Sequence, residues 1–231
     1  MTQQKHMAAL EERDTNRLEA FSDGVFAIAI TLLVLNIHIP SEGDQVDLGQ
    51  VLRDQWPSYL AYLLSFLTIL NMWVNHHNTF TFIARTDHWF LFINGLLLMG
   101  VCVLPFPTAL LAQYFSSPTN QFVATLVYAG VFTYNGLAFF LLWNYAASQM
   151  RLLDKRLDPV KIRKLSVRYL TNPPLYVAAL LLVFIYPLAT LFIYFLLMVF
   201  YMLPFLSLPR PADLYRDDLG EQTVAVKESD S

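Results

Sequence analysis

The chain has 231 residues, of which 56% are hydrophobic and only 14% are charged, and its formal net charge is -3. Because an average soluble domain has about 25% charged residues, this composition argues against a water-soluble protein. The single cysteine, Cys102, excludes an intrachain disulfide framework and a cysteine-based metal cluster.

Four long stretches of the chain contain no Asp, Glu, Lys or Arg. They are residues 24–41, 55–84, 89–150 and 169–209. A helix that crosses a bilayer needs about 20 consecutive apolar residues, so the last two stretches are each long enough for two helices. Polar residues 116–120 divide the third stretch, and Tyr186-Pro187 divides the fourth.

The sequence therefore predicts an all-α, polytopic membrane protein with six transmembrane helices. We expect a membrane domain over residues 17–209, preceded by a short segment (1–16) and followed by a polar tail (210–231) that we expect to be disordered. The six predicted spans are about 17–39, 55–84, 89–115, 121–150, 169–186 and 188–208.

The positions of the basic residues predict the orientation. Every Lys and Arg except Arg53 lies before residue 24, in the turn 85–88, in the loop 151–168 or in the tail. Cytoplasmic loops carry the excess of positive charge, so both termini are predicted to be cytoplasmic, in a multi-pass protein of a cell membrane such as a prokaryotic inner membrane. For the basic loop 151–168, contact with lipid headgroups is favoured over nucleic-acid binding.

The first predicted span has a regular stripe on one face. Ile28, Thr31, Leu32 and Leu35 follow the spacing i, i+3, i+4 and i+7, which places them together on a helix. Periodicity alone does not separate a pore wall from ordinary core packing.

Three motifs give the chain a resemblance to a known family. Residues 17–23, Arg-Leu-Glu-Ala-Phe-Ser-Asp, match an RxxxFSD signature; Trp73-Val74-Asn75-His76-His77 and Leu104-Pro105-Phe106-Pro107-Thr108 continue the match. The chain resembles the single-repeat, prokaryotic type of the transmembrane protein 175 family. The resemblance implies a potassium-permeable channel, a homotetramer of six-span subunits whose first helices line a central pore. It also implies that the carbonyl filter of ordinary potassium channels is lacking, and the sequence has no TVGYG segment.

By this resemblance, the stripe lines the pore. Ile28 is expected at the narrowest constriction, Leu32 and Leu35 on the wall outward of it, and Thr31 as a layer of hydroxyl groups. A ring of apolar side chains holds water poorly and acts as a hydrophobic gate, so an ion must lose part of its hydration shell to cross. We expect a leak-like channel of modest potassium selectivity, with membrane lipid as a further partner; the gating stimulus, the degree of selectivity and the permeability to protons stay open.

The polar residues of the signature predict a buried network. Asp23 needs a partner inside the membrane, and His77 of the second span lies at about the same depth, so we expect Asp23, Ser22, His77 and Arg17 to fix the first helix. Trp73, one turn before His77, is expected to pack over it. Phe21 completes the set of signature residues.

Other functions are open but less favoured. Asp23 and His77 would also suit a proton-coupled transporter or a proton-permeable channel, because histidine titrates near neutral pH. Adjacent His76 and His77 point about 100° apart on a helix, a poor geometry for holding one metal ion, so neither a metal site nor a cofactor is expected. The sequence has no GxSxG, GxGxxG or HExxH motif, and we do not expect an enzyme.

Overall fold

The computed structural model describes residues 2–37, 47–202 and 211–215, and within these ranges the chain is all-α. Two short 3₁₀ helices, Leu33–Asn36 and Ser148–Met150, extend α1 and α6. The α-helices of the described residues are α1 (Thr2–Leu32), α2 (Leu48–Asp54), α3 (Trp56–Phe80), α4 (His88–Val103), α5 (Pro105–Tyr114), α6 (Gln121–Ala147), α7 (Pro159–Leu170), α8 (Asn172–Leu182), α9 (Pro187–Met202) and α10 (Pro211–Leu214).

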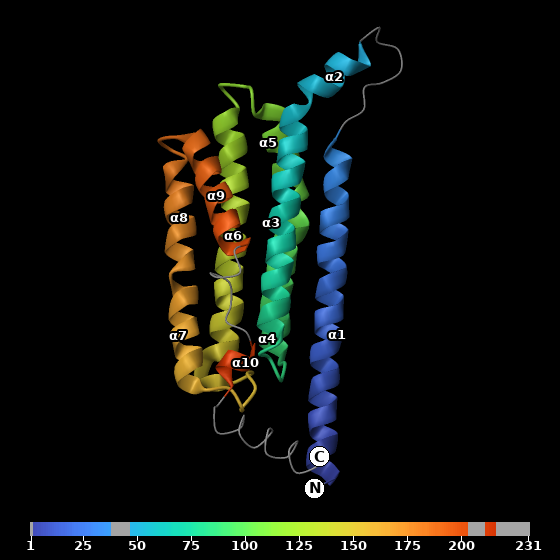
Figure 1. The fold of residues 1–231 in the computed structure, drawn as a ribbon, viewed down its shortest axis with the longest axis vertical. Helices are drawn as coiled ribbons and strands as arrows, with labels where there is room; N and C mark the ends of the chain where they lie inside the picture. The colour runs from blue at the N-terminus through green and yellow to red at the C-terminus, as the bar shows by residue number, and fades with distance from the viewer. Residues whose placement is uncertain (1, 38–46, 203–210, 216–231) are drawn as a thin grey trace, which may run out of the picture.

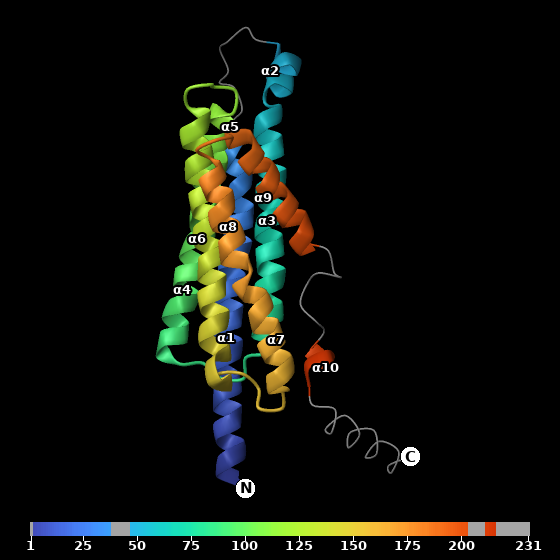
Figure 2. The ribbon, with the colours of Figure 1, turned by 90° about the vertical axis from the view of Figure 1, so that its left-hand side faces the viewer.

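The helices form an elongated bundle in which successive long segments run up and down (Figures 1 and 2). The start of α1, the turn between α3 and α4, the start of α7 and α10 lie at one end, which we call the inner end. The short helix α2 lies at the opposite, outer end. Helix α1 stands at the edge of the bundle and packs against α3 and α4.

Within the part of the chain that the structure describes, four segments are long and apolar enough to cross a membrane, as a membrane protein with several spans requires. In an apolar bilayer every backbone polar group must be paired within the segment, and a helix achieves this by itself. The four segments are Thr15–Asn36, Trp56–Phe80, His88–Tyr114 and Gln121–Met150.

The two remaining predicted spans coincide with shorter helices. Helix α8 has 11 residues and α9 has 16, and both are shorter than the roughly 20 residues that a full crossing requires. The total of six spans, with both termini on the cytoplasmic side, therefore stays a prediction.

Proline residues begin two of the helices in the apolar stretches: α9 begins at Pro187, where the sequence predicts a division, and α5 begins at Pro105, inside the predicted span 89–115. Helix α4 ends at Val103 and α5 begins at Pro105, because proline lacks the N–H that would continue the hydrogen-bond pattern. The amide of Asn36, at the outer end of the first span, donates a hydrogen bond of 3.0 Å to the carbonyl oxygen of Pro105. This contact ties the end of the first span to the break between α4 and α5.

The inner end is more ordered than the sequence predicts. The second half of the predicted loop 151–168 belongs to α7, an amphipathic helix that buries Ile162 and Leu165 beneath its charged residues. In the predicted disordered tail, residues 211–215 pack against the bundle: Leu214 is buried, and its carbonyl oxygen accepts a hydrogen bond from the backbone of Asp158. Residues 216–231 of the tail lie outside the described residues.

Candidate functional site

Helix α1 has two contrasting faces. Its buried face carries Ser22, Phe26, Ala29 and Leu33, which pack into the bundle. The four residues of the predicted pore stripe are all exposed on the other side: Ile28 (60% exposed), Thr31, Leu32 (43%) and Leu35 (69%). The stripe therefore does not belong to the core of the subunit.

The outer end of the stripe changes helix type. The chain is α-helical to Leu32 and continues as a 3₁₀ helix over Leu33–Asn36. Since a 3₁₀ helix has three residues per turn, side chains three apart lie directly above one another. Leu35 is thereby held in line with Leu32.

Thr31 presents an oxygen acceptor on this apolar face. Its hydroxyl donates a hydrogen bond of 2.9 Å to the carbonyl oxygen of Ile28. With its proton engaged inside the helix, the exposed hydroxyl oxygen offers lone pairs, and these are what a partly dehydrated cation requires.

Two polar contacts, one helical turn apart, join α1 to α3. The indole Nε1 of Trp73 donates a hydrogen bond of 2.8 Å to Oδ1 of Asp23, and Nδ1 of His77 lies 2.9 Å from Oε1 of Glu19. The indole and imidazole rings stack with centroids 5.9 Å apart, as expected from the sequence. Glu19 and Asp23 are four residues apart on α1, and Trp73 and His77 are four residues apart on α3. The two contacts therefore lie one above the other, each between one side chain of α1 and one of α3.

This geometry corrects the predicted network. His77 was expected to pair with Asp23, but Trp73 takes that place and His77 contacts Glu19 instead. The two helices run in opposite directions, so the inner residue of one pair faces the inner residue of the other. Glu19, which lies within the signature, was not predicted to contact His77, although its spacing of four from Asp23 was a usable signal.

A second chain of hydrogen bonds, through the buried side chains of Ser22, Asn94 and His76, joins α1, α3 and α4. The amide Nδ2 of Asn94 donates to Oγ of Ser22 (2.9 Å), and Oγ of Ser22 donates to the carbonyl oxygen of Leu18 (2.8 Å). Nε2 of His76 lies 2.9 Å from Oδ1 of Asn94. Because that amide oxygen only accepts, His76 carries its proton on Nε2.

His76 and Asn94 were not among the residues predicted for the site. His76 is completely buried and lies between the rings of Phe26 and Phe80, with centroid distances of 5.3 and 4.3 Å. Asn94 carries the only side-chain amide of the apolar helix α4, and this was the sequence signal for it.

The remaining signature residues, Arg17 and Phe21, lie on the exposed face of α1. Within the described part of this subunit, the buried network therefore includes Ser22 but not Arg17.

At the inner end, Asp87 joins α4 to the end of α6. Its carboxylate caps α4 by accepting from the backbone N–H of Phe90 (2.9 Å), accepts from the hydroxyl of Tyr145 (2.8 Å) and lies 3.0 Å from Nη2 of Arg151. Partial burial by itself would raise the pKa of Asp87. The hydrogen bonds from Phe90 and Tyr145 and the charge of Arg151 outweigh burial and lower this pKa below 3.8.

The fold and these contacts define a polytopic α-helical membrane protein whose first helix is anchored on one side only. Residues 17–105 match the family model described as endosomal/lysosomal potassium channel TMEM175. A potassium channel of Chamaesiphon minutus is 51% identical over 179 residues, which cover 77% of this chain and 88% of the relative. The chain belongs to the transmembrane protein 175 family.

Two further comparisons agree with this assignment. A potassium channel of Streptomyces collinus is 46% identical over 156 residues, or 68% of this chain and 76% of that relative. The crystal structure of a lysosomal potassium-selective channel TMEM175 homolog from Chamaesiphon minutus superposes with a TM-score of 0.73 at 46% identity, covering 82% of this chain and 96% of the other.

Proposed function

We propose that this chain is the subunit of a potassium-permeable, leak-like cation channel in which four copies place α1 around a central pore. Two bacterial relatives, at 51% and 46% identity, are named potassium channels. In this proposal potassium is the permeant ion, the chain associates with itself as a homotetramer, and the protein resides in the cell membrane.

The observation that carries the proposal is the one-sided anchoring of α1. The buried face of α1 is held by hydrogen bonds through Ser22 and Asp23 and by packing of Phe26. The stripe from Ile28 to Leu35, on the other face, is exposed. Lipid tails are as apolar as leucine, so burial of apolar surface does little to hold helices together in a membrane, and polar contacts matter more. A helix fixed in this way keeps the stripe pointing out of its own subunit.

Small residues beside the stripe favour contact between copies of α1. Ala20, Gly24 and Ala27 are exposed, and a Cβ added at Gly24 would have no other atom within 4 Å. Small side chains let membrane helices approach closely. Four first helices can therefore meet near the position of Ile28.

In such a tetramer each stripe residue becomes a ring of four. Ile28 forms the constriction, Leu32 and Leu35 form the apolar wall, and the Thr31 hydroxyl oxygens replace part of the water that a cation gives up. Potassium holds its hydration shell less tightly than sodium, so partial dehydration favours potassium. A hydrophobic constriction of this kind conducts when it is wet and stops conducting when it dries.

The contacts do not favour a proton relay through Asp23 and His77. Asp23 is bonded to Trp73, and His77 is paired with Glu19. Among the described residues, no hydrogen bond joins Asp23 directly to His77, so the shortest step of that relay is missing.

The test is ion flux through the purified protein in liposomes under an imposed membrane potential, with potassium, sodium and protons supplied in turn. We expect a passive potassium flux that follows the electrochemical gradient, a smaller sodium flux and no required proton movement. Slow, saturating turnover, or potassium movement only together with protons, would reject the channel and favour a transporter.

A further inference from the structure

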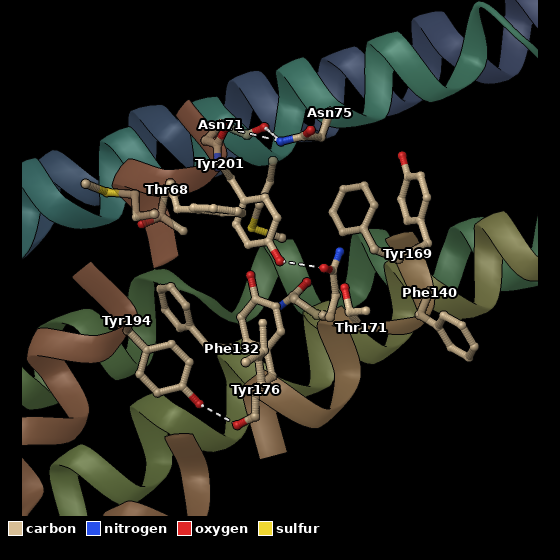
Figure 3. Close-up of a pocket in the computed structure, with 18 of the residues that line it drawn as sticks. Thr68, Asn71, Asn75, Phe132, Phe140, Tyr169, Thr171, Tyr176, Tyr194 and Tyr201 are labelled. Carbon is tan, nitrogen blue, oxygen red and sulfur yellow. Dashed lines mark hydrogen bonds between the residues drawn. The ribbon is translucent and has the colours of Figure 1, made fainter. Parts of the chain in front are cut away.

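A cavity of about 190 Å³ lies between α3, α6, α7, α8 and α9, away from the exposed face of α1 (Figure 3). Most of its wall is apolar, but it also carries a set of amide and hydroxyl groups, and we call it the polar cavity. None of the described residues that line it is charged. Asparagine, threonine and tyrosine side chains contribute its polar groups, and Asn71 and Asn75 place it in the inner half of α3.

Several polar groups of this cavity have unused hydrogen-bonding capacity. The hydroxyl of Tyr201 donates to Oδ1 of Asn172 (2.7 Å), which leaves the amide N–H groups of Asn172 available. Nδ2 of Asn75 donates to the backbone oxygen and Oδ1 of Asn71, which leaves Oδ1 of Asn75 and Nδ2 of Asn71. No described residue pairs with these groups or with the hydroxyl of Tyr176. Polar groups at membrane depth that have no hydrogen-bond partner are unfavourable, so an occupant with both donors and acceptors is favoured.

The ring of Tyr176 is held in a fixed place. A Cβ at Gly136 would lie 2.7 Å from Cδ2 of Tyr176, so only glycine lets this ring lie against α6. The ring also stacks on Tyr201, with centroids 6.5 Å apart and planes 3° from parallel. The Tyr176 hydroxyl is thus a preorganised part of the cavity wall.

A second cavity, of about 350 Å³, continues toward the outer end between α3, α5, α6 and α9. Its lining is almost entirely apolar, with side chains such as Leu60, Leu64 and Phe195. The two cavities share Thr68, Phe132, Tyr194 and Met198 as lining residues. They therefore form one groove, which carries polar groups in the inner half of the bundle and is almost entirely apolar in the outer half.

We propose that this groove binds a neutral amphiphile from the inner leaflet, with a compact hydroxyl-bearing head in the polar cavity and a hydrocarbon chain in the apolar one. A charged headgroup finds no counter-charge among the described residues that line the groove, and burying an unpaired charge is far more costly than burying a hydroxyl. Water alone would suit the polar cavity but not its apolar continuation. The proposal concerns a site apart from α1 and does not depend on the proposed ion conduction.

The test uses the full chain in lipid nanodiscs with a photoactivatable monoacylglycerol that carries a diazirine on its acyl chain. Mass spectrometry of the cross-linked protein is expected to place the label on α3, α6 or α9. Tyr176→Phe and Asn172→Leu each remove one hydrogen-bonding group and should lower labelling about fivefold, the effect of one neutral hydrogen bond. Unlabelled monoacylglycerol should compete, and phosphatidic acid, with its charged head, should not.

Two control variants remove a tyrosine hydroxyl and an asparagine amide at positions outside the groove. The hydroxyl of Tyr134 donates to the carbonyl oxygen of Leu96, and Asn144 is exposed; neither lines the groove. Tyr134→Phe and Asn144→Leu should label like the parent protein. Labelling that is unchanged in Tyr176→Phe, or equal competition by phosphatidic acid, would overturn the proposal. If Asn172→Leu fails to fold, the loss of a single oxygen in Tyr176→Phe still decides it.

Discussion

The indole nitrogen of Trp73 lies 2.8 Å from Oδ1 of Asp23, and this hydrogen bond joins the helix with the exposed stripe to the helix behind it. A hydrogen bond to a carboxylate is roughly twice as strong as one between neutral groups. The bond fixes the rotation of α1 about its own axis, because Asp23 is on the side of the helix away from Ile28. Its loss should therefore loosen the position of the whole stripe.

Trp73→Phe tests this bond directly. The phenylalanine ring can still stack on His77, but it has no N–H to donate, so Asp23 loses its partner. We expect a loss of about 1.5–3 kcal/mol in stability, the range for hydrogen bonds to charged groups. Thermal unfolding of the purified protein in detergent measures it. Trp89→Phe, at a side chain that is 65% exposed, is the matched control, and equal effects of the two changes would show that the indole N–H of Trp73 contributes nothing.

The buried chain from Ser22 through Asn94 to His76 gives a second prediction. Ser22→Ala leaves Nδ2 of Asn94 without its acceptor in a dry site, which should cost about 1–3 kcal/mol. Asn94→Leu alone should also destabilise, but the double variant should lose less than the sum, since the two residues share one bond. Denaturation of the four proteins of this cycle provides the measurement. Ser148→Ala, at an exposed serine, should be neutral; strictly additive losses would mean that the Ser22–Asn94 contact carries no energy.

The sequence predicts the apolar segments well because a bilayer imposes a simple rule. Any segment within it must be nearly free of charge and must pair its own backbone. The gap between α4 and α5 at Pro105 follows from a local rule as well, because proline lacks the N–H that would continue the helix. Helix α7 was not predicted because tertiary contacts stabilise it: Ile162 and Leu165 pack into the bundle. In the sequence alone, the many charged residues of this segment indicated a loop.

The polar contacts of α1 show a different limit. From the sequence, Asp23 and His77 were expected at the same depth and in contact. In the structure Asp23 contacts Trp73 instead, and His77 contacts Glu19, one helical turn from Asp23. Depth follows from counting residues from the membrane ends, whereas the register between two helices depends on how side chains such as Phe26 and His76 interlock. Counting does not supply that register.

Asp87 makes the stability of the inner end depend on pH. Its folded pKa is lowered below the ordinary value of 3.8, so the folded state favours the ionised carboxylate. The resulting stability is fully present above that ordinary value and is lost as the pH falls through the lower folded pKa. Asp87→Asn should therefore be less stable than the parent protein at neutral pH and should lose less stability on acidification.

Unfolding temperatures measured from neutral to acidic pH check this prediction. Asp54→Asn changes an exposed carboxylate and should follow the parent curve. Tyr145→Phe removes one donor to Asp87 and should give an intermediate curve. If the Asp87→Asn and parent curves run parallel over the whole range, the acid sensitivity arises elsewhere.

Ile28 is the residue on which the proposed pore depends most. Replacing it with asparagine would put a ring of amides in place of a ring of apolar side chains, so water would enter the constriction more easily. In the liposome assay we expect severalfold greater potassium flux and a smaller preference for potassium over sodium. Ile28→Ala, which widens the ring but leaves it apolar, should change both quantities in the same direction and by less.

Leu141→Asn introduces the same amide at an exposed position of α6 and should leave flux and preference unchanged, because lipid rather than a pore would face it. Unaltered currents in both Ile28 variants would mean that the exposed stripe of α1 faces lipid or another subunit surface and that conduction follows a different path.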